Sequence, residues 1–101
     1  MASSKEYLDF VLEQLSDISD ISYRAMMGEY IIYYCGKIIG GIYDNRLLVK
    51  PTASAIKFIS KPVMESPYPG AKPMIMVRDI ENKDFLKNLF NVIYSDLLNT
   101  K

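Results

Sequence analysis

Side chains that commonly carry out catalysis are sparse in this sequence. It contains no histidine, which excludes the Ser-His and Cys-His pairs that activate a nucleophile and any zinc site with a histidine ligand. The single cysteine, Cys35, cannot form an internal disulfide, and in a strand we expect it to be a small buried hydrophobe rather than a reactive thiol. The pairs Asp17/Asp20 and Asp79/Glu81 could serve acid–base chemistry, but they fall near predicted helix ends, where acidic residues are common. We therefore expect no catalytic residues and no enzyme activity.

Motifs for cofactors and metal ions are also lacking. Gly40-Gly41 has neither the GxGxxG nor the Walker spacing that would cradle a phosphate group. We expect these glycines to allow close packing of another element, most simply a helix. The sequence therefore predicts no cofactor site and no metal site.

Tyrosine and basic residues are the features that could recognise a partner, because Tyr and Arg are enriched in binding surfaces. The candidate partner surface consists of Arg24, Tyr30, Tyr33, Tyr34, Tyr43, Lys50 and Tyr68. The alternative is an ordinary sheet face whose phenols reach water at its edge, with the two basic residues pairing with carboxylates. Four methionines could give an adaptable surface, but we expect them to fill the core: Met26, Met27, Met74 and Met76.

Composition narrows the class of protein. The 101 residues fit one domain (residues 1–101), and half of them are apolar while 24% are charged, as in an ordinary globular protein. Twelve basic residues balance twelve acidic ones, so no overall positive field favours binding to nucleic acid. The N-terminus lacks the pattern of a signal peptide, and the most apolar stretch, residues 30–43, is too short to span a bilayer. We expect a cytoplasmic protein without a membrane segment.

The first half of the chain predicts a helix followed by a β-meander. Ser3 and Glu6 form a capping pair, and an apolar stripe follows for about four turns until the polar run at residues 16–22. Four strands are then expected around turns at Gly36-Lys37 and Asp44-Asn45-Arg46, at residues 23–26, 30–35, 38–43 and 47–50. Residues 30–35 are apolar or aromatic on both faces, which is typical of a central strand.

The second half of the chain adds a short helix, a strand and a longer helix. Thr52 can cap a helix to about Ile59, and the proline-rich residues 62–73 are expected to form an ordered loop without regular structure. Residues 73–78 supply a fifth strand, and an apolar stripe over residues 85–98 predicts a C-terminal helix that packs on the sheet. The predicted fold class is α+β: a predominantly antiparallel sheet of about five strands, N- and C-terminal helices and a short middle helix.

The order of these residues resembles the N-terminal domain of the TfoX/Sxy family of bacterial competence regulators. Arg24-Ala-Met26-Met27-Gly28-Glu29-Tyr30 is close to the family's Arg-x-Met-Phe-Gly-Gly-Tyr opening, and a tyrosine-rich strand, a Gly-Lys turn and a strand ending at Leu47-Leu-Val-Lys50 follow it. Tyr68 before Pro73-Met74 and the final helix match the closing pattern. The departures are Met27 for phenylalanine and Glu29 for the second glycine.

The resemblance implies a regulatory role, since full-length family members resemble co-activators that work with the catabolite activator protein at competence promoters. It implies a non-catalytic protein-interaction domain, here as a stand-alone N-terminal domain ending at Lys101, with a transcription factor as the expected protein partner. A small-ligand-binding or enzymatic domain with a Tyr/Arg/Lys-lined pocket is the alternative. We also expect a homodimer, because the central strand is apolar on both faces.

Overall fold

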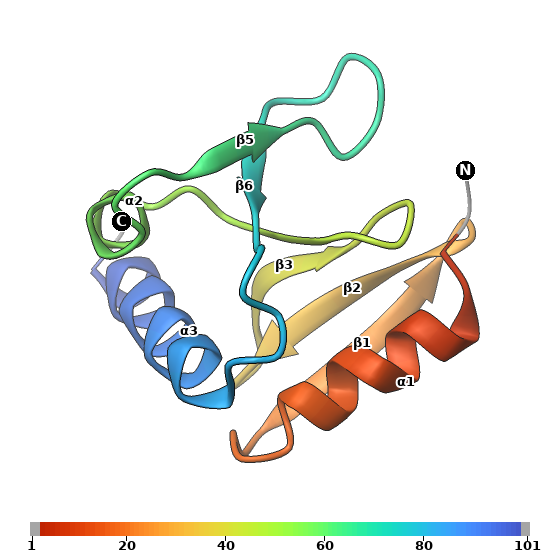
Figure 1. Cartoon of the computed structure of the whole chain (residues 1–101), viewed down its shortest axis with the longest axis horizontal. Coiled ribbons are helices and arrows are strands. Elements are labelled where there is room, and N and C mark those ends of the chain that lie inside the picture. Colours follow the sequence, from red (N-terminus) through yellow and green to blue (C-terminus); the bar gives the residue numbers. More distant parts are fainter. Residues whose placement is uncertain (1–2, 100–101) are drawn as a thin grey trace.

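The structure, a computed structural model, describes residues 3–99 as an antiparallel sheet with helices on one side of it (Figure 1). The helices are α1 (Lys5–Gln14), α2 (Ala53–Phe58) and α3 (Lys83–Leu98). The strands are β1 (Ile21–Met26), β2 (Glu29–Tyr34), β3 (Lys37–Ile42), β4 (Leu47–Val49), β5 (Val63–Glu65) and β6 (Met74–Met76). They form one six-stranded sheet in the order β1-β2-β3-β4-β6-β5. The α+β class and the central position of β2 are confirmed, but the sheet has six strands rather than five.

Two-residue turns connect the first four strands. The central residues of each turn both have positive φ: 52° and 85° at Met27-Gly28, 51° and 80° at Cys35-Gly36, and 54° and 55° at Asp44-Asn45. This is the geometry of type I′ turns, whose twist matches that of paired strands. The prediction of a Gly36-Lys37 turn was wrong by one residue, because Lys37 already pairs with Tyr34. Cys35 therefore lies in a turn and is exposed, not buried in a strand.

Strand β5 lies inside the segment that we expected to be irregular. Val63, Met64 and Glu65 pair with Met76, Ile75 and Met74 of β6. The strand is three residues long and lies at the edge of the sheet, where Pro62 and Pro67 flank it without removing a ladder hydrogen bond. A segment this short between prolines carries too little periodicity to be recognised from sequence.

The helices begin at polar caps. Ser4, not Ser3, caps α1, since its side chain accepts a hydrogen bond from the backbone N–H of Tyr7 at 3.1 Å. Helix α1 has ten residues, fewer than the four turns predicted. Thr52 caps α2 as predicted, and Asn82 caps α3, where its side chain accepts a hydrogen bond from the backbone N–H of Phe85.

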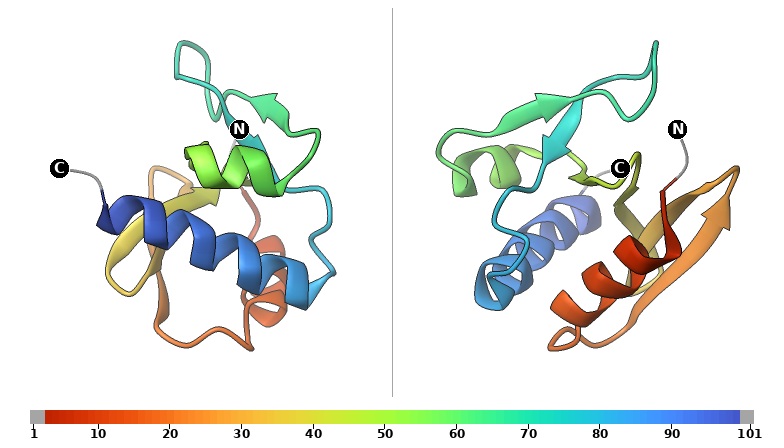
Figure 2. Two further views of the ribbon diagram at one scale, coloured as in Figure 1. Left: turned by 90° about the vertical axis from the view of Figure 1, so that its left-hand side faces the viewer. Right: turned by 45° about the vertical axis from the view of Figure 1, so that its right-hand side comes forward.

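One hydrophobic core lies between the helices and one face of the sheet, which we call the inner face. Figure 2 shows α1 and α3 on the same side of the first three strands. Leu8 and Val11 of α1 and Leu89 and Phe90 of α3 are fully buried in one cluster with side chains of the inner face. Those inner-face side chains are Ile32, Ile39, Ile42, Leu47, Val49 and Ile75. No helix in residues 3–99 is both long and apolar enough to cross a membrane.

The glycine pair in β3 marks a close approach between strands. A Cβ atom on Gly40 would overlap the carbonyl oxygen of Leu48 and lie 2.7 Å from Cα of Val49, both in β4. The nearest atoms to Gly40 therefore belong to a strand, β4, and not to the predicted helix, although α3 also lies against β3. The register between β2 and β3 shifts beside Gly40, where Ile39 has no Cα partner and its side chain is buried in the core.

Candidate functional site

A groove opens at the turn between β1 and β2, on the outer face of the sheet, away from the helices. Its volume is about 610 Å³, and its apolar lining comes from Met26, Met27, Ile31, Tyr43, Pro67 and Tyr68. A second hollow of about 520 Å³ adjoins it and shares Glu29, Pro67 and Tyr68 with it. We call the first the hairpin-tip groove.

The hairpin side of the groove exposes two methionines. Met27 is 97% exposed and Met26 is 46% exposed, so the prediction that they fill the core was wrong. Met27 also has a φ of 52° at a turn position that favours Gly, Asn or Asp. A side chain that is almost fully exposed buries little apolar surface in the isolated chain, so it gains little hydrophobic stabilisation there. Both features are typical of a residue that contacts a partner.

The opposite side of the groove is formed by Tyr43 and the loop that carries Tyr68. Burial, followed by the proximity of Tyr68 and Glu29, raises the pKa of Tyr43, so its phenol is neutral at physiological pH. Tyr68 is 61% exposed, while Pro67 beside it is buried. The Oγ of Ser66 donates to the carbonyl oxygen of Ala71 at 3.1 Å, which closes the loop on itself. The groove therefore offers aromatic surface on an ordered loop.

Arg46 fixes the base of this loop. Its Nη1 lies 2.7 Å from Oε1 of Glu65, and its Nη2 donates to the carbonyl oxygen of Ser66 at 3.4 Å. Its Nε also donates to the carbonyl oxygen of Tyr43 at 3.1 Å, within the third turn. One guanidinium group thus links both tyrosine-bearing segments of the groove, which positions them relative to each other.

Glu29 lies in the floor of the groove, where it joins three distant segments. Its Oε1 accepts hydrogen bonds from the Ser3 hydroxyl at 2.7 Å and from the backbone N–H of Asp44 at 3.2 Å. The Oγ of Ser3 accepts the backbone N–H of Asn45 at 3.0 Å, and Oδ1 of Asn45 accepts the backbone N–H of Ser4 at 2.9 Å. The carboxylate is therefore engaged in holding the two turns and the start of α1 together.

The predicted partner surface is divided between the two faces of the sheet. Tyr43 and Tyr68 meet in the groove, and Arg24 and Tyr33 lie on the same outer face, since Arg24 pairs with Ile31 and Tyr33 follows two residues later. Tyr30 and Tyr34 lie on the inner face and pack against the core.

Tyr34 and Lys50, the remaining members, have structural contacts away from the groove. The Tyr34 hydroxyl donates to Oδ1 of Asn91 in α3 at 2.8 Å, and burial raises its pKa. Lys50 lies beyond the end of β4, where its backbone N–H donates to the carbonyl oxygen of Ile39 at 2.9 Å. The exposure of Met26 and Met27 was not predicted from the sequence. The Met27-Gly28 pair between two predicted strands could have indicated this exposure, because such a pair is typical of a two-residue turn.

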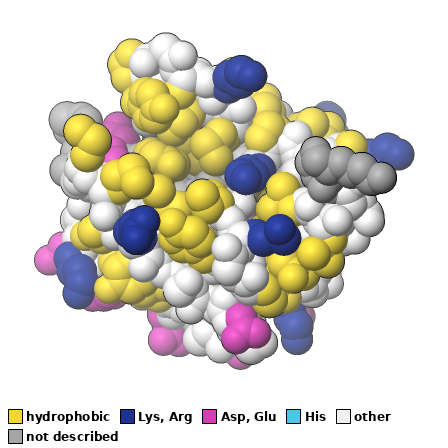
Figure 3. Space-filling model, turned by 180° about the vertical axis from the view of Figure 1, so that it is seen from behind, with side chains coloured by type: hydrophobic (Ala, Val, Ile, Leu, Met, Phe, Trp, Pro, Cys, Tyr) yellow, Lys and Arg dark blue, Asp and Glu magenta, His cyan; other side chains and the backbone are white. Residues whose placement is uncertain are grey.

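Seen from behind, the molecule presents a largely apolar surface (Figure 3). Hydrophobic side chains occupy most of the middle of this view, lysine and arginine side chains are scattered among them, and acidic side chains gather toward the edges. This face of the protein, opposite to the one in Figure 1, therefore exposes a large apolar surface.

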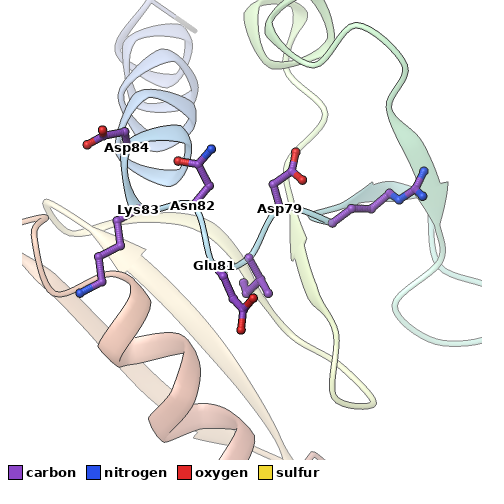
Figure 4. A pocket seen from close by; sticks show the side chains of 7 residues that line it. Asp79, Glu81, Asn82, Lys83 and Asp84 are labelled. Carbon is purple, nitrogen blue, oxygen red and sulfur yellow. The ribbon is translucent and has the colours of Figure 1, made fainter.

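Another hollow, of about 590 Å³, lies before α3 and is lined by residues 78–84. Its polar side chains do not converge: Asp79 and Asn82 point one way, Glu81 the opposite way, and Lys83 and Asp84 point away from the others (Figure 4). Within residues 3–99, no three His, Cys, Asp or Glu side chains are grouped as metal ligands would be. The hairpin-tip groove is therefore the better candidate for a binding site.

Comparison with known proteins places this architecture in a family. An uncharacterised 12.7 kDa protein in the trpE 5′ region of Spirochaeta aurantia is 36% identical over 80 residues, which is 79% of this chain and 70% of that protein. The TfoX N-terminal domain family matches residues 13–86, a span that includes the groove and all six strands. The chain belongs to the TfoX N-terminal domain family.

Proposed function

We propose that this protein is a non-catalytic regulatory domain that binds a transcription factor through the hairpin-tip groove. The observation that carries the proposal is Met27, an apolar side chain that is 97% exposed at a strained turn beside an aromatic groove. Partner surfaces are enriched in tyrosine, and methionine adapts its shape to a bound surface. The family relationship supports the choice of a regulatory protein as the partner.

A small ligand is the second candidate occupant, because a volume of about 610 Å³ lies in the usual range for ligand sites. Such sites normally combine enclosure with free, convergent polar groups. Here the one carboxylate in the groove already accepts two hydrogen bonds, and Met27 extends into solvent instead of covering the groove. These two features favour a protein surface as the occupant.

The decisive experiment places a photo-crosslinking amino acid at position 27 in the native cell, with the same amino acid at position 88 as the matched control. Asn88 is exposed on α3, far along the chain from the groove. We expect a transcription factor to be crosslinked from position 27 and not from position 88. Crosslinks to transcription factors that are equal at both positions, or absent from both, would contradict the proposal.

Substitutions then separate the two candidate occupants. Met27→Asp and Tyr68→Ala should each weaken binding of the crosslinked partner about tenfold or more, as expected for central contacts of an interface. Asn88→Asp is the matched surface control and should leave binding unchanged. If metabolite extract raises the unfolding temperature of the wild-type chain and no transcription factor binds, the groove is a small-ligand site instead.

A further inference from the structure

Strand β1 is a free edge of the sheet. It is an end member of the strand order, so β2 is its only neighbour among the strands of residues 3–99. Every residue from Ser22 to Met26 is exposed, including those on the inner face, where Tyr23 is 44% exposed. Figure 2 shows α1 beside this hairpin, on the same side of it as α3. The edge has six residues and carries no proline, bulge or lysine, features that commonly protect such edges, and Arg24 is its one charged side chain.

The turn at Met27-Gly28 determines which backbone groups point outward from this edge. Residues flanking a two-residue turn form a hydrogen-bonded pair, and bonded and non-bonded pairs alternate along an antiparallel ladder. Met26 pairs with Glu29, so Met26, Arg24 and Ser22 bond to β2. The same alternation continues to Asp20, whose carbonyl oxygen accepts the backbone N–H of Cys35 at 3.0 Å. The N–H and C=O groups of Ile21, Tyr23 and Ala25 therefore point away from the sheet.

We propose that β1 pairs antiparallel with β1 of a second copy of this chain, with the two-fold axis at Tyr23. In this register Tyr23 lies opposite Tyr23 of the second copy, and Ile21 lies opposite Ala25. All three residues that pair in this way have outward backbone groups, so each free N–H meets a free C=O. Two sheets of six strands would become one continuous sheet.

The charge of Arg24 favours this register over the one in which the two-fold axis lies at Arg24. A two-fold axis at Arg24 would place the two guanidinium groups directly opposite each other, which is unfavourable in a sheet. The axis at Tyr23 places Arg24 opposite Ser22 of the second copy instead, and it brings two tyrosines together, a favourable cross-strand pair. The chain has no net charge, so no long-range repulsion opposes association of two copies.

The dimer would place two hairpin-tip grooves on one face of the continuous sheet. Met27 lies four residues from the proposed axis, so the two hairpin tips would be about 25 Å apart along the strands. Such a pair of sites suits a partner with two-fold symmetry. The dimer itself does not depend on the function proposed for the groove.

Sedimentation equilibrium over roughly a hundredfold range of concentration tests the association. We expect the wild-type mass to rise from monomer to dimer. Ala25→Pro removes an N–H that points outward, so it should weaken the dimer about tenfold or more while the fold is retained. Arg24→Pro is the matched contrast, because it removes an N–H that bonds to β2 and should lower the stability of the fold itself.

Charge substitutions at Ser22 test the proposed register of the two β1 strands without introducing a proline. Ser22→Glu places a carboxylate opposite Arg24 of the second copy in two symmetric pairs, and should tighten the dimer about two- to thirtyfold, whereas Ser22→Lys should weaken it. A wild-type chain that stays monomeric at the highest concentration would overturn the proposal. So would a dimer whose dissociation constant is the same for the wild type, Ser22→Glu and Ser22→Lys.

Discussion

The carboxylate of Asp96, in α3, caps the start of α2 through Ser54, 42 residues away in the sequence. It accepts the backbone N–H of Ser54 at 2.8 Å and the Ser54 hydroxyl at 2.7 Å. A carboxylate at this position satisfies one amide donor in the first turn of the short helix and places a negative charge at its N-terminus. These bonds dock α2, which has only six residues, against the C-terminal helix.

The first prediction concerns acid stability. Hydrogen bonds from the Ser54 side chain, then from its backbone and from Thr52, lower the pKa of Asp96. A lowered folded-state pKa means that this contribution to stability is present above the unfolded pKa of about 3.9 and is lost as the pH falls through the folded-state value. Urea unfolding of Asp96→Asn should therefore show less loss of stability between neutral pH and about pH 3 than wild type. Asp17→Asn, an exposed loop control, should behave like wild type.

Glycine at position 40 is predicted to be essential for the close approach of β3 and β4. Gly40→Ala should lower the free energy of unfolding by about 3 kcal/mol or more, since the added Cβ meets backbone atoms that cannot move independently. Gly36→Ala is the matched control, because nothing lies within 4 Å of its Cβ position and only the φ of +80° opposes the change. It should cost about 1 to 2 kcal/mol. Equal effects in chemical denaturation would show that β4 does not pack against Gly40 in this way.

Docking of the last helix is tested by Leu89→Ala. Leu89 is fully buried in the core cluster. The substitution should cost about 2 to 5 kcal/mol through lost transfer free energy and a residual cavity. Asn88→Ala, one residue earlier on the exposed side, should change stability by less than about 0.5 kcal/mol. A small effect of Leu89→Ala would contradict the placement of α3.

The carboxylate in the groove floor has a predicted structural role. Glu29→Ala leaves the Ser3 hydroxyl and the Asp44 N–H without their acceptor and should lower the free energy of unfolding by about 1 to 2 kcal/mol. Glu29→Gln keeps an acceptor oxygen and should lose less than half as much. If both variants are as stable as wild type, the hydrogen bonds between the turns and the start of α1 contribute nothing to folding.

Duplex DNA should not bind to the isolated domain with useful affinity at physiological salt. The equal numbers of basic and acidic residues leave no net charge to neutralise phosphates, and phosphate neutralisation supplies most of the affinity of such complexes. Mobility-shift titrations at two salt concentrations provide the measurement. Sub-micromolar binding that weakens steeply with salt would refute the prediction.

The sequence by itself determined the elements with strong local signals. The tyrosine-rich run of β2, the cap at Thr52 and the apolar stripe of α3 each depend on contacts within a few residues, so their type was predictable. Family membership was also readable from the motif around Gly28, since it rests on order along the chain.

Only the tertiary structure decided which residues share a face and which are left exposed. The shift of the first turn after β2 placed Cys35 in solvent, and pairing with β6 created β5 from three residues between prolines. The groove joins Met27 to Tyr68 across 40 intervening positions, through the pairing of the strands and the fold of the proline loop. Such a site has no local pattern, because long-range pairing sets the distance between its residues and propensity does not.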